Sequence, residues 1–201
     1  LALRLLGPEN AGKYYFAVYV ATLFEILTNF GLNTLLTRQV ARNREDGNRY
    51  LWNTNVLRLG LVAAAAPLLV LFLLLYRPMP RDTALAILLL GLGLVPSSIS
   101  AGLSAVFMAF EVMVIPAVVS TVTTLLKVSL GTVVLLGGWG FVGLAGTSIA
   151  VNTVTLAILL GLVVALFFRP RPQPEPGLRR ELVAAAVHIL AELALLIPFY
   201  V

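Results

Sequence analysis

The sequence predicts an all-α fold, a polytopic bundle of transmembrane helices, from three observations. Of the 201 residues, 60% are hydrophobic and 11% are charged, whereas about a quarter of the residues in a soluble domain are charged. The mean hydropathy of +0.98 confirms the bias. Apolar stretches of about 20 residues, the length that crosses a bilayer as a helix, recur between polar segments. Since backbone groups in lipid must be paired within the segment, we expect helices.

Six apolar stretches are expected to span the membrane. In chain order they are Tyr14–Leu36, Val56–Tyr76, Ala84–Phe110, Val112–Leu136, Phe141–Phe168 and Leu182–Val201. The chain begins without Met and stops inside the last stretch, so we expect a fragment of a longer protein. Leu1–Leu6 is then the tail of an earlier span.

Polar segments rich in helix breakers separate these stretches. Gly7–Lys13 is expected to open the first complete helix, and Thr37–Asn55 to form a long polar hairpin. Two prolines mark the loop Arg77–Thr83, and the glycines of 137–140 favour a tight turn. Glu111 alone separates the third and fourth stretches. The alternating prolines of Arg169–Glu181 favour an extended linker between two bundles.

These boundaries predict three parts of the chain. Residues 1–168 form a first transmembrane bundle, residues 169–181 a proline-rich linker, and residues 182–201 the start of a second bundle.

The distribution of Lys and Arg orients the chain. The 37–55 segment holds four arginines and the 169–181 segment holds four more. An even number of spans separates the two segments, so both face the same side. The opposite side carries four basic residues, which makes the eight-charge side cytoplasmic. We therefore interpret the net charge of +5 as a topology signal, and expect no nucleic-acid partner.

The residue inventory argues against an enzyme. The chain has no Cys and one His, which excludes thiolate and multi-His metal sites, and we expect no cofactor. Gly138-Trp-Gly140-Phe-Val-Gly143 matches the dinucleotide pattern G-x-G-x-x-G. That pattern needs a preceding strand and an acidic residue about 20 positions later, but no acid follows before Glu175. We interpret it as a turn followed by close helix packing.

Polar side chains recur at helical spacing inside the expected spans. The four rows are Thr22, Glu25, Asn29 and Asn33; Ser120, Thr124, Lys127 and Gly131; Ser148, Asn152 and Thr155; and Ser97, Ala101, Ala105 and Ala109, the last of which we interpret as a packing row. Small and hydroxyl residues at this spacing serve close helix packing or line a transport path. The asparagines favour the second reading, because each amide has four hydrogen-bonding sites to satisfy.

Two charged residues, Glu25 and Lys127, lie near the middle of their spans. A charge at that depth costs roughly 2.5 to 3.5 kcal/mol. Either the two form an internal ion pair, or they line a hydrated cavity. In the cavity, Lys127 attracts an anion and the carboxylate exchanges a proton or a cation.

Three further ionisable residues have less central positions. His188 and Glu192 are four residues apart on one helical face, which suits either a proton relay or a hydrogen-bonded core His. Arg58 lies in the first cytoplasmic turn of its span, where we expect it to extend toward lipid headgroups.

The segment Leu6–Arg42 resembles the start of bacterial and archaeal oligosaccharide flippases, which belong to the multidrug/oligosaccharidyl-lipid/polysaccharide exporter superfamily. The matching features are Leu6-Gly-Pro8, Gly12-x-Tyr14, Phe16-Ala17, Asn29-Phe-Gly-Leu32 and Thr37-Arg38, with Glu111-Val-Met113, Leu126-Lys127 and Gly138-Trp-Gly140-x-x-Gly143 further on. The resemblance covers essentially the whole chain.

The resemblance implies the N-terminal half of a two-lobe transporter that carries its cargo between the lobes. Such proteins move sugars linked to undecaprenyl or dolichyl pyrophosphate across the cytoplasmic membrane. The implied partners are membrane lipids, the lipid-linked oligosaccharide and glycan biosynthesis enzymes. A multidrug or cation antiporter of the same superfamily is the alternative, followed by a membrane polyprenyl-phosphate sugar transferase.

Within that reading, we expect Lys127 to bind the diphosphate. The expected substrate-binding residues are Lys127, Asn29, Asn33, Asn152 and Arg58. The expected ion-coupling residues are Glu25, His188 and Glu192.

Overall fold

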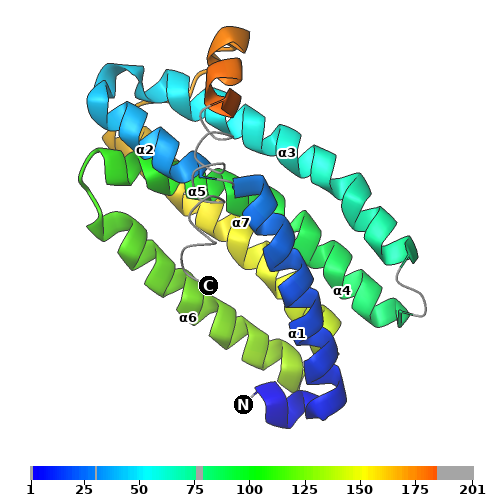
Figure 1. The fold of residues 1–201 in the computed structure, drawn as a ribbon. Helices are drawn as coiled ribbons and strands as arrows, with labels where there is room; N and C mark the ends of the chain where they lie inside the picture. Colours follow the sequence, from blue (N-terminus) through cyan, green and yellow to red (C-terminus); the bar gives the residue numbers. More distant parts are fainter. Residues whose placement is uncertain (1, 30, 76–78, 185–201) are drawn as a thin grey trace, which may run out of the picture.

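The structure is a computed structural model that describes residues 2–29, 31–75 and 79–184. This part of the chain folds into a bundle of helices without strands (Figure 1). The all-α prediction is confirmed. The expected span Leu182–Val201, apart from its first three residues, lies outside the described residues.

The helices follow one another through short connections. In chain order they are α1 (Ala2–Asn29), α2 (Leu32–Arg42), the 3-10 turn η1 (Arg44–Asp46), α3 (Gly47–Leu75), α4 (Arg81–Leu92), α5 (Leu94–Ala109), α6 (Val114–Leu136) and α7 (Gly140–Leu166). Residues 176–184 are also helical.

Four helical segments of the described chain are long and apolar enough to cross a membrane. They are Arg44–Leu75, Arg81–Ala109, Val114–Leu136 and Gly140–Leu166. The chain is therefore a multi-pass membrane protein. The first expected span is not among the four by this measure.

That first span, predicted as one helix over Tyr14–Leu36, is broken. Ahead of this span, α1 has a kink at Gly7, whose φ is 74°, and the helix restarts at Pro8, where a fixed φ suits the first helical turn. The break within the span follows Asn29, where Gly31 takes a left-handed φ of 71° and begins α2. Glycine adopts this conformation without steric strain. Asn29 and Asn33 therefore belong to two different helices.

The polar hairpin predicted for Thr37–Asn55 is wrong in its secondary structure. Helix α2 continues through Arg42, and α3 begins at Gly47. The helix extends through polar sequence because Leu51, Asn53 and Thr54 are buried against the rest of the bundle. Tertiary packing thus outweighs the loop-like composition of this segment.

The third span, predicted as Ala84–Phe110, is two helices. They meet at Gly93, which closes α4 and precedes α5. The Asn152 amide donates to the Gly93 carbonyl oxygen at 3.2 Å. A buried backbone carbonyl needs a hydrogen-bond donor, and the Asn152 side chain supplies one to Gly93, where the helix is interrupted.

The predicted helix boundary at Glu111 and the predicted turn at 137–140 are confirmed. Glu111 has a φ of 64°, and Gly138 and Gly140 have φ values of 76° and 62°. A Cβ on Gly143 would lie 2.6 Å from Val134 Cγ1. The G-x-G-x-x-G run is therefore a turn followed by close packing of α7 on α6.

The two arginine-rich segments lie at the same end of the bundle, as their parity predicts. The Nδ2 group of Asn48 in α3 donates to the carbonyl oxygen of Arg171 at 3.1 Å. Asn53 of α3 donates in the same way to Gln173 at 2.9 Å. Figure 1 shows the orange segment against the start of α3.

The segment predicted as an extended linker, Arg169–Glu181, is not helical in its first half, and the prediction is wrong in its second half. Residues 168–175 are outside any helix, but residues 176–184 are helical. Leu178 and Leu182 of this helix are buried in a cluster with Leu32 and Leu35 of α2. The apolar contact with α2 stabilises this helix, and Pro176 occupies its first position, where proline is tolerated.

Candidate functional site: a polar pocket in the membrane bundle

A polar pocket of about 290 Å³ lies among α1, α4, α5, α6 and α7. It brings together three of the predicted site residues, Glu25, Lys127 and Asn152. The other polar side chains that line it are Tyr14, Thr22, Ser97 and Ser148. Residues from all four rows predicted from helical spacing thus meet at one place.

Glu25 is half-buried at this pocket. Its Oε1 atom accepts a hydrogen bond from Ser97 Oγ at 3.1 Å. The internal ion pair with Lys127 that the sequence left open is not formed. Within the described part of the chain, the ion pairs involve other residues.

Lys127 is exposed on α6, on the same helix face as Ser120 and Thr124. The Thr124 hydroxyl donates to the Ser120 carbonyl oxygen at 2.8 Å. Gly131 continues this row into the interface with α7, where a Cβ would lie 3.0 Å from Leu144 Cδ2. The row thus presents polar groups at one end and packs closely at the other.

Asn152 and Ser148 are the polar residues that α7 contributes to the pocket. Asn152 Nδ2 donates a hydrogen bond to the carbonyl oxygen of Gly93 at 3.2 Å. The amide therefore has its oxygen left to accept from a hydroxyl group. Thr155, the remaining residue of the row Ser148, Asn152 and Thr155, does not line the pocket. Its hydroxyl donates to the carbonyl oxygen of Val151 at 2.8 Å.

Arg58 does not extend to lipid headgroups, and that expectation is wrong. Its residue exposure is 0%. Nη1 donates to Asn29 Oδ1 at 3.1 Å and to the Ser98 carbonyl oxygen at 2.8 Å, while Nη2 donates to Asn33 Oδ1 at 2.5 Å. Hydrogen-bond acceptors on α1, α2 and α5 thus hold the guanidinium inside the bundle.

Asn29 and Asn33 consequently lie at this guanidinium rather than among the residues that line the polar pocket. The predicted row from Thr22 to Asn33 divides at the helix break. Its first half faces the pocket, and its second half binds Arg58. His188 and Glu192 lie outside the described residues.

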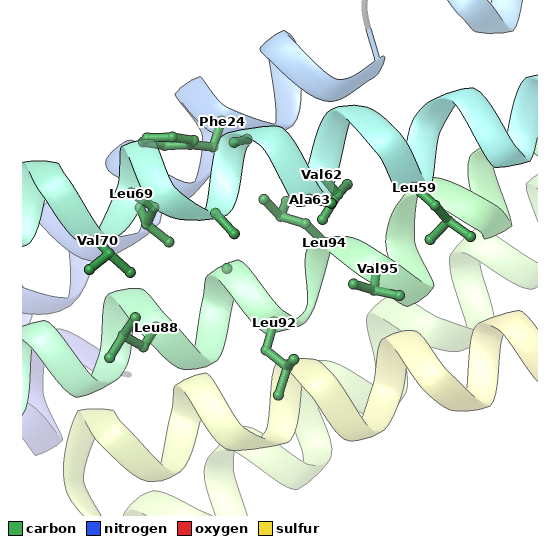
Figure 2. A pocket seen from close by; sticks show the side chains of 13 residues that line it. Phe24, Leu59, Val62, Ala63, Leu69, Val70, Leu88, Leu92, Leu94 and Val95 are labelled. Atoms are coloured by element: carbon green, nitrogen blue, oxygen red, sulfur yellow. The ribbon is translucent and has the colours of Figure 1, made fainter.

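A second, apolar groove of about 380 Å³ lies among α3, α4 and α5, next to Phe24 of α1 (Figure 2). It is lined by Phe24 of α1 and by residues of α3, α4 and α5, including Leu59, Val62, Leu88 and Leu92. No predicted site residue lines it. Adjacent residues of α1, Phe24 and Glu25, thus face an apolar and a polar space.

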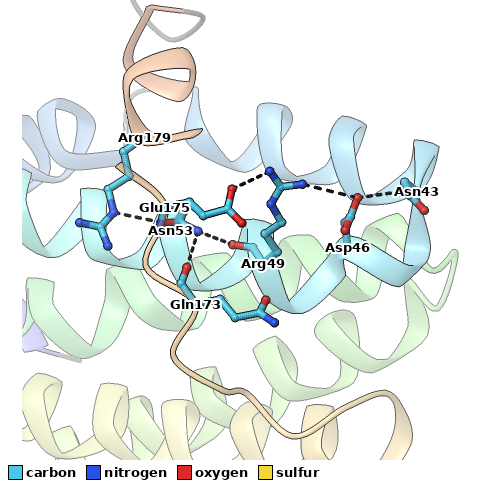
Figure 3. A network of polar contacts seen from close by, with 7 residues as sticks. All are labelled: Asn43, Asp46, Arg49, Asn53, Gln173, Glu175 and Arg179. Atoms are coloured by element: carbon cyan, nitrogen blue, oxygen red, sulfur yellow. Dashed lines mark hydrogen bonds and ion pairs between the residues drawn. The ribbon is translucent and has the colours of Figure 1, made fainter. Parts of the chain in front are cut away.

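Sequence reasoning missed a polar network at the arginine-rich end (Figure 3). Arg49 Nη2 donates to Glu175 Oε2 at 2.6 Å. Asn53 Oδ1 accepts from the Glu175 backbone N–H at 3.0 Å and from Arg179 Nε at 3.1 Å. The two segments are more than a hundred residues apart, and no spacing rule links them.

The fold and the pocket define a class: a multi-pass membrane protein that keeps charged and amide groups inside its helix bundle. A family model described as "Polysaccharide biosynthesis protein" matches residues 1–201, and the chain belongs to this family. The family is part of the oligosaccharide flippase group of the exporter superfamily, so the resemblance drawn from Leu6–Arg42 is confirmed. Neither the curated proteins nor the solved structures contain a match.

Proposed function

We propose that this chain is the N-terminal lobe of a transporter that flips lipid-linked oligosaccharides across the cytoplasmic membrane. Residues 1–168 form that lobe, residues 169–181 join it to a second lobe, and the second lobe starts at residue 182. The observation that supports this proposal most is the pocket in which Glu25 and Lys127 lie together without an ion pair.

In this proposal, Lys127 attracts the diphosphate of the carrier lipid. An ammonium group at membrane depth costs several kcal/mol to maintain, and an anionic cargo offsets that cost. The free oxygen of Asn152 accepts from a sugar hydroxyl. Rocking of the two lobes then exposes the loaded site to either side of the membrane.

Glu25 couples the cycle to an ion gradient. Its carboxylate lies in the pocket with a hydroxyl partner, Ser97, at 3.1 Å. A half-buried carboxylate in such a setting can bind a proton or a cation in one state and release it in the other. We propose transport without covalent chemistry, so the bonds of the cargo stay unchanged.

The experiment uses the whole protein in proteoliposomes, with a fluorescent undecaprenyl pyrophosphate-linked sugar as the probe. We expect flipping by the wild type and its loss in Lys127→Ala. Lys13→Ala is the matched control, because Lys13 is ion-paired with Glu9 at 2.6 Å and does not line the pocket. Transport of organic cations without any flipping would instead identify an antiporter.

A further inference from the structure

Arg58 spans a helix break with its two terminal nitrogens. Asn29 is the last residue of α1, and Asn33 is the second residue of α2. Nη1 binds the first amide and Nη2 binds the second. The bond from Nη1 to the Ser98 carbonyl oxygen attaches this arrangement to α5 at 2.8 Å.

The chemistry of the guanidinium fixes the orientation of both amides. Arg carries N–H donors and no acceptor, so each asparagine must turn its oxygen toward Arg58. The Nδ2 group lies across Cγ from that oxygen and therefore points away from the guanidinium. In the described part of the chain, neither Nδ2 group has a hydrogen-bond partner.

Arg58 itself is closed to a ligand. The residue has 0% exposure, whereas Asn33 is exposed and Asn29 is half-buried. A cargo that reaches this site meets the amides before it meets the charge. Burying a charged group is costly unless the surrounding groups satisfy it. The three acceptors bind the two terminal nitrogens without an acidic partner, whereas the buried Nε has no hydrogen-bond partner among the described residues.

We propose that Arg58 is a positioning residue, which holds Asn29 and Asn33 across the helix break so that both amides present N–H donors to the cargo. The matching groups on the cargo are acceptor oxygens of its phosphate-sugar head. This inference rests on the proposed function. It assigns the two amides the role of hydrogen-bond donors to the cargo, whereas from the sequence alone each amide could donate or accept.

The most informative variants remove the N–H donor of each amide and keep the oxygen that contacts Arg58. Asn33→Asp and Asn29→Asp retain an oxygen for the guanidinium but replace the N–H₂ group by a second acceptor. Folding is protected because a carboxylate next to Arg58 strengthens the hydrogen bond. Asn10→Asp is the matched control, since Asn10 is exposed and donates to the Leu6 carbonyl oxygen.

Two measurements on the whole protein in lipid nanodiscs separate position from binding. The first is the distance between spin labels on cysteines at Ala41 of α2 and Met108 of α5, both exposed. This chain has no native Cys to interfere. The second is the affinity for an undecaprenyl pyrophosphate-linked monosaccharide.

We expect Asn33→Asp to keep the wild-type label distance and to weaken probe binding about tenfold, the size of one lost charge-assisted contact. Arg58→Lys should broaden the distance distribution and weaken binding as well. The loss of binding on Arg58→Gln should vanish in the Asn29→Ala, Asn33→Ala background, because the charge acts through the amides.

Wild-type binding by Asn33→Asp would overturn the proposal. So would an equal loss on Arg58→Gln with and without the amides, which would mean direct contact with the cargo. If the wild type does not bind the probe, the proposed function fails. The label distance then decides separately whether Arg58 positions α2, and an unchanged distance in Arg58→Lys and Arg58→Gln would refute that role.

Discussion

Arg58 and Lys127 show two ways in which a membrane bundle keeps a positive charge. Arg58 has 0% exposure and donates to acceptors on three helices. Lys127 is exposed at the edge of a polar pocket and, within the described chain, takes part in no ion pair. The difference teaches that a charge satisfied by the protein serves its architecture, while an unsatisfied one is available to a ligand.

Among the variants that test this comparison, we expect Lys127→Ala to have the largest effect, a loss of transport. We expect the flipping rate of a lipid-linked sugar to fall about thirtyfold or more, since removing one partner of a desolvated charge contact costs about 2 kcal/mol or more. Thermal unfolding should barely change, because the side chain is exposed. A flipping assay beside a melting curve measures both. Normal flipping would remove Lys127 from the mechanism.

Arg58→Met should show the opposite pattern, a loss of stability. The change leaves the oxygens of Asn29, Asn33 and Ser98 without their donor. An unsatisfied buried polar group costs about 1 to 3 kcal/mol, and thermal unfolding in detergent measures the loss. Arg42→Met, at an exposed position of α2, should stay within about 0.5 kcal/mol. Equal stability of the two variants would contradict the comparison.

Glu25→Gln tests the acidic residue that lines the pocket together with Lys127. The amide still accepts from Ser97 but cannot take up a proton or bind a cation by charge. We expect the flipping rate to stop responding to an imposed ion gradient, while flipping without a gradient continues. Proteoliposomes with and without the gradient measure the response. A preserved response would assign coupling to another group.

The smallest effect is expected at the arginine-rich end, on Asn53→Ala. Asn53 donates to two backbone oxygens and accepts from Glu175 and Arg179. Since a hydrogen bond contributes about 1 kcal/mol net, the linker should detach more often. Trypsin should then cleave faster after Arg179 and Arg180, because the bonds that follow Arg169 and Arg171 precede proline and resist trypsin. Asn43→Ala, which loses one contact to Asp46, is the control and should leave the cleavage rate unchanged.

The sequence predicted four of the six spans and the turn at residues 137–140, because apolar length and glycine positions are local signals. The helix boundary at Glu111 and the packing at Gly143 follow from such signals. The polar helix that starts at Gly47 was missed because burial, which its composition does not reveal, stabilises it. The break at Gly31 was missed because a glycine inside an apolar run is often helical.

The candidate site was predicted in part for the same reason. Helical spacing placed Glu25, Lys127 and Asn152 on polar faces, and the structure brings these faces to one pocket. Spacing could not show that Arg58 turns inward, since its acceptors lie on three other helices. It also could not pair Asn53 with the linker, because a contact of that sequence separation depends on the whole topology.

The most direct test of the account is the access of water to the pocket. In a cysteine-free form of the whole protein, Ser97→Cys places a thiol in the pocket beside Glu25. Leu71→Cys places one at an exposed apolar position of α3. We predict that a small, charged, water-soluble thiol reagent labels residue 97 in membranes, that lipid-linked sugar slows the labelling, and that residue 71 stays unlabelled. A thiol at residue 97 that is as unreactive as the one at residue 71 would contradict the account.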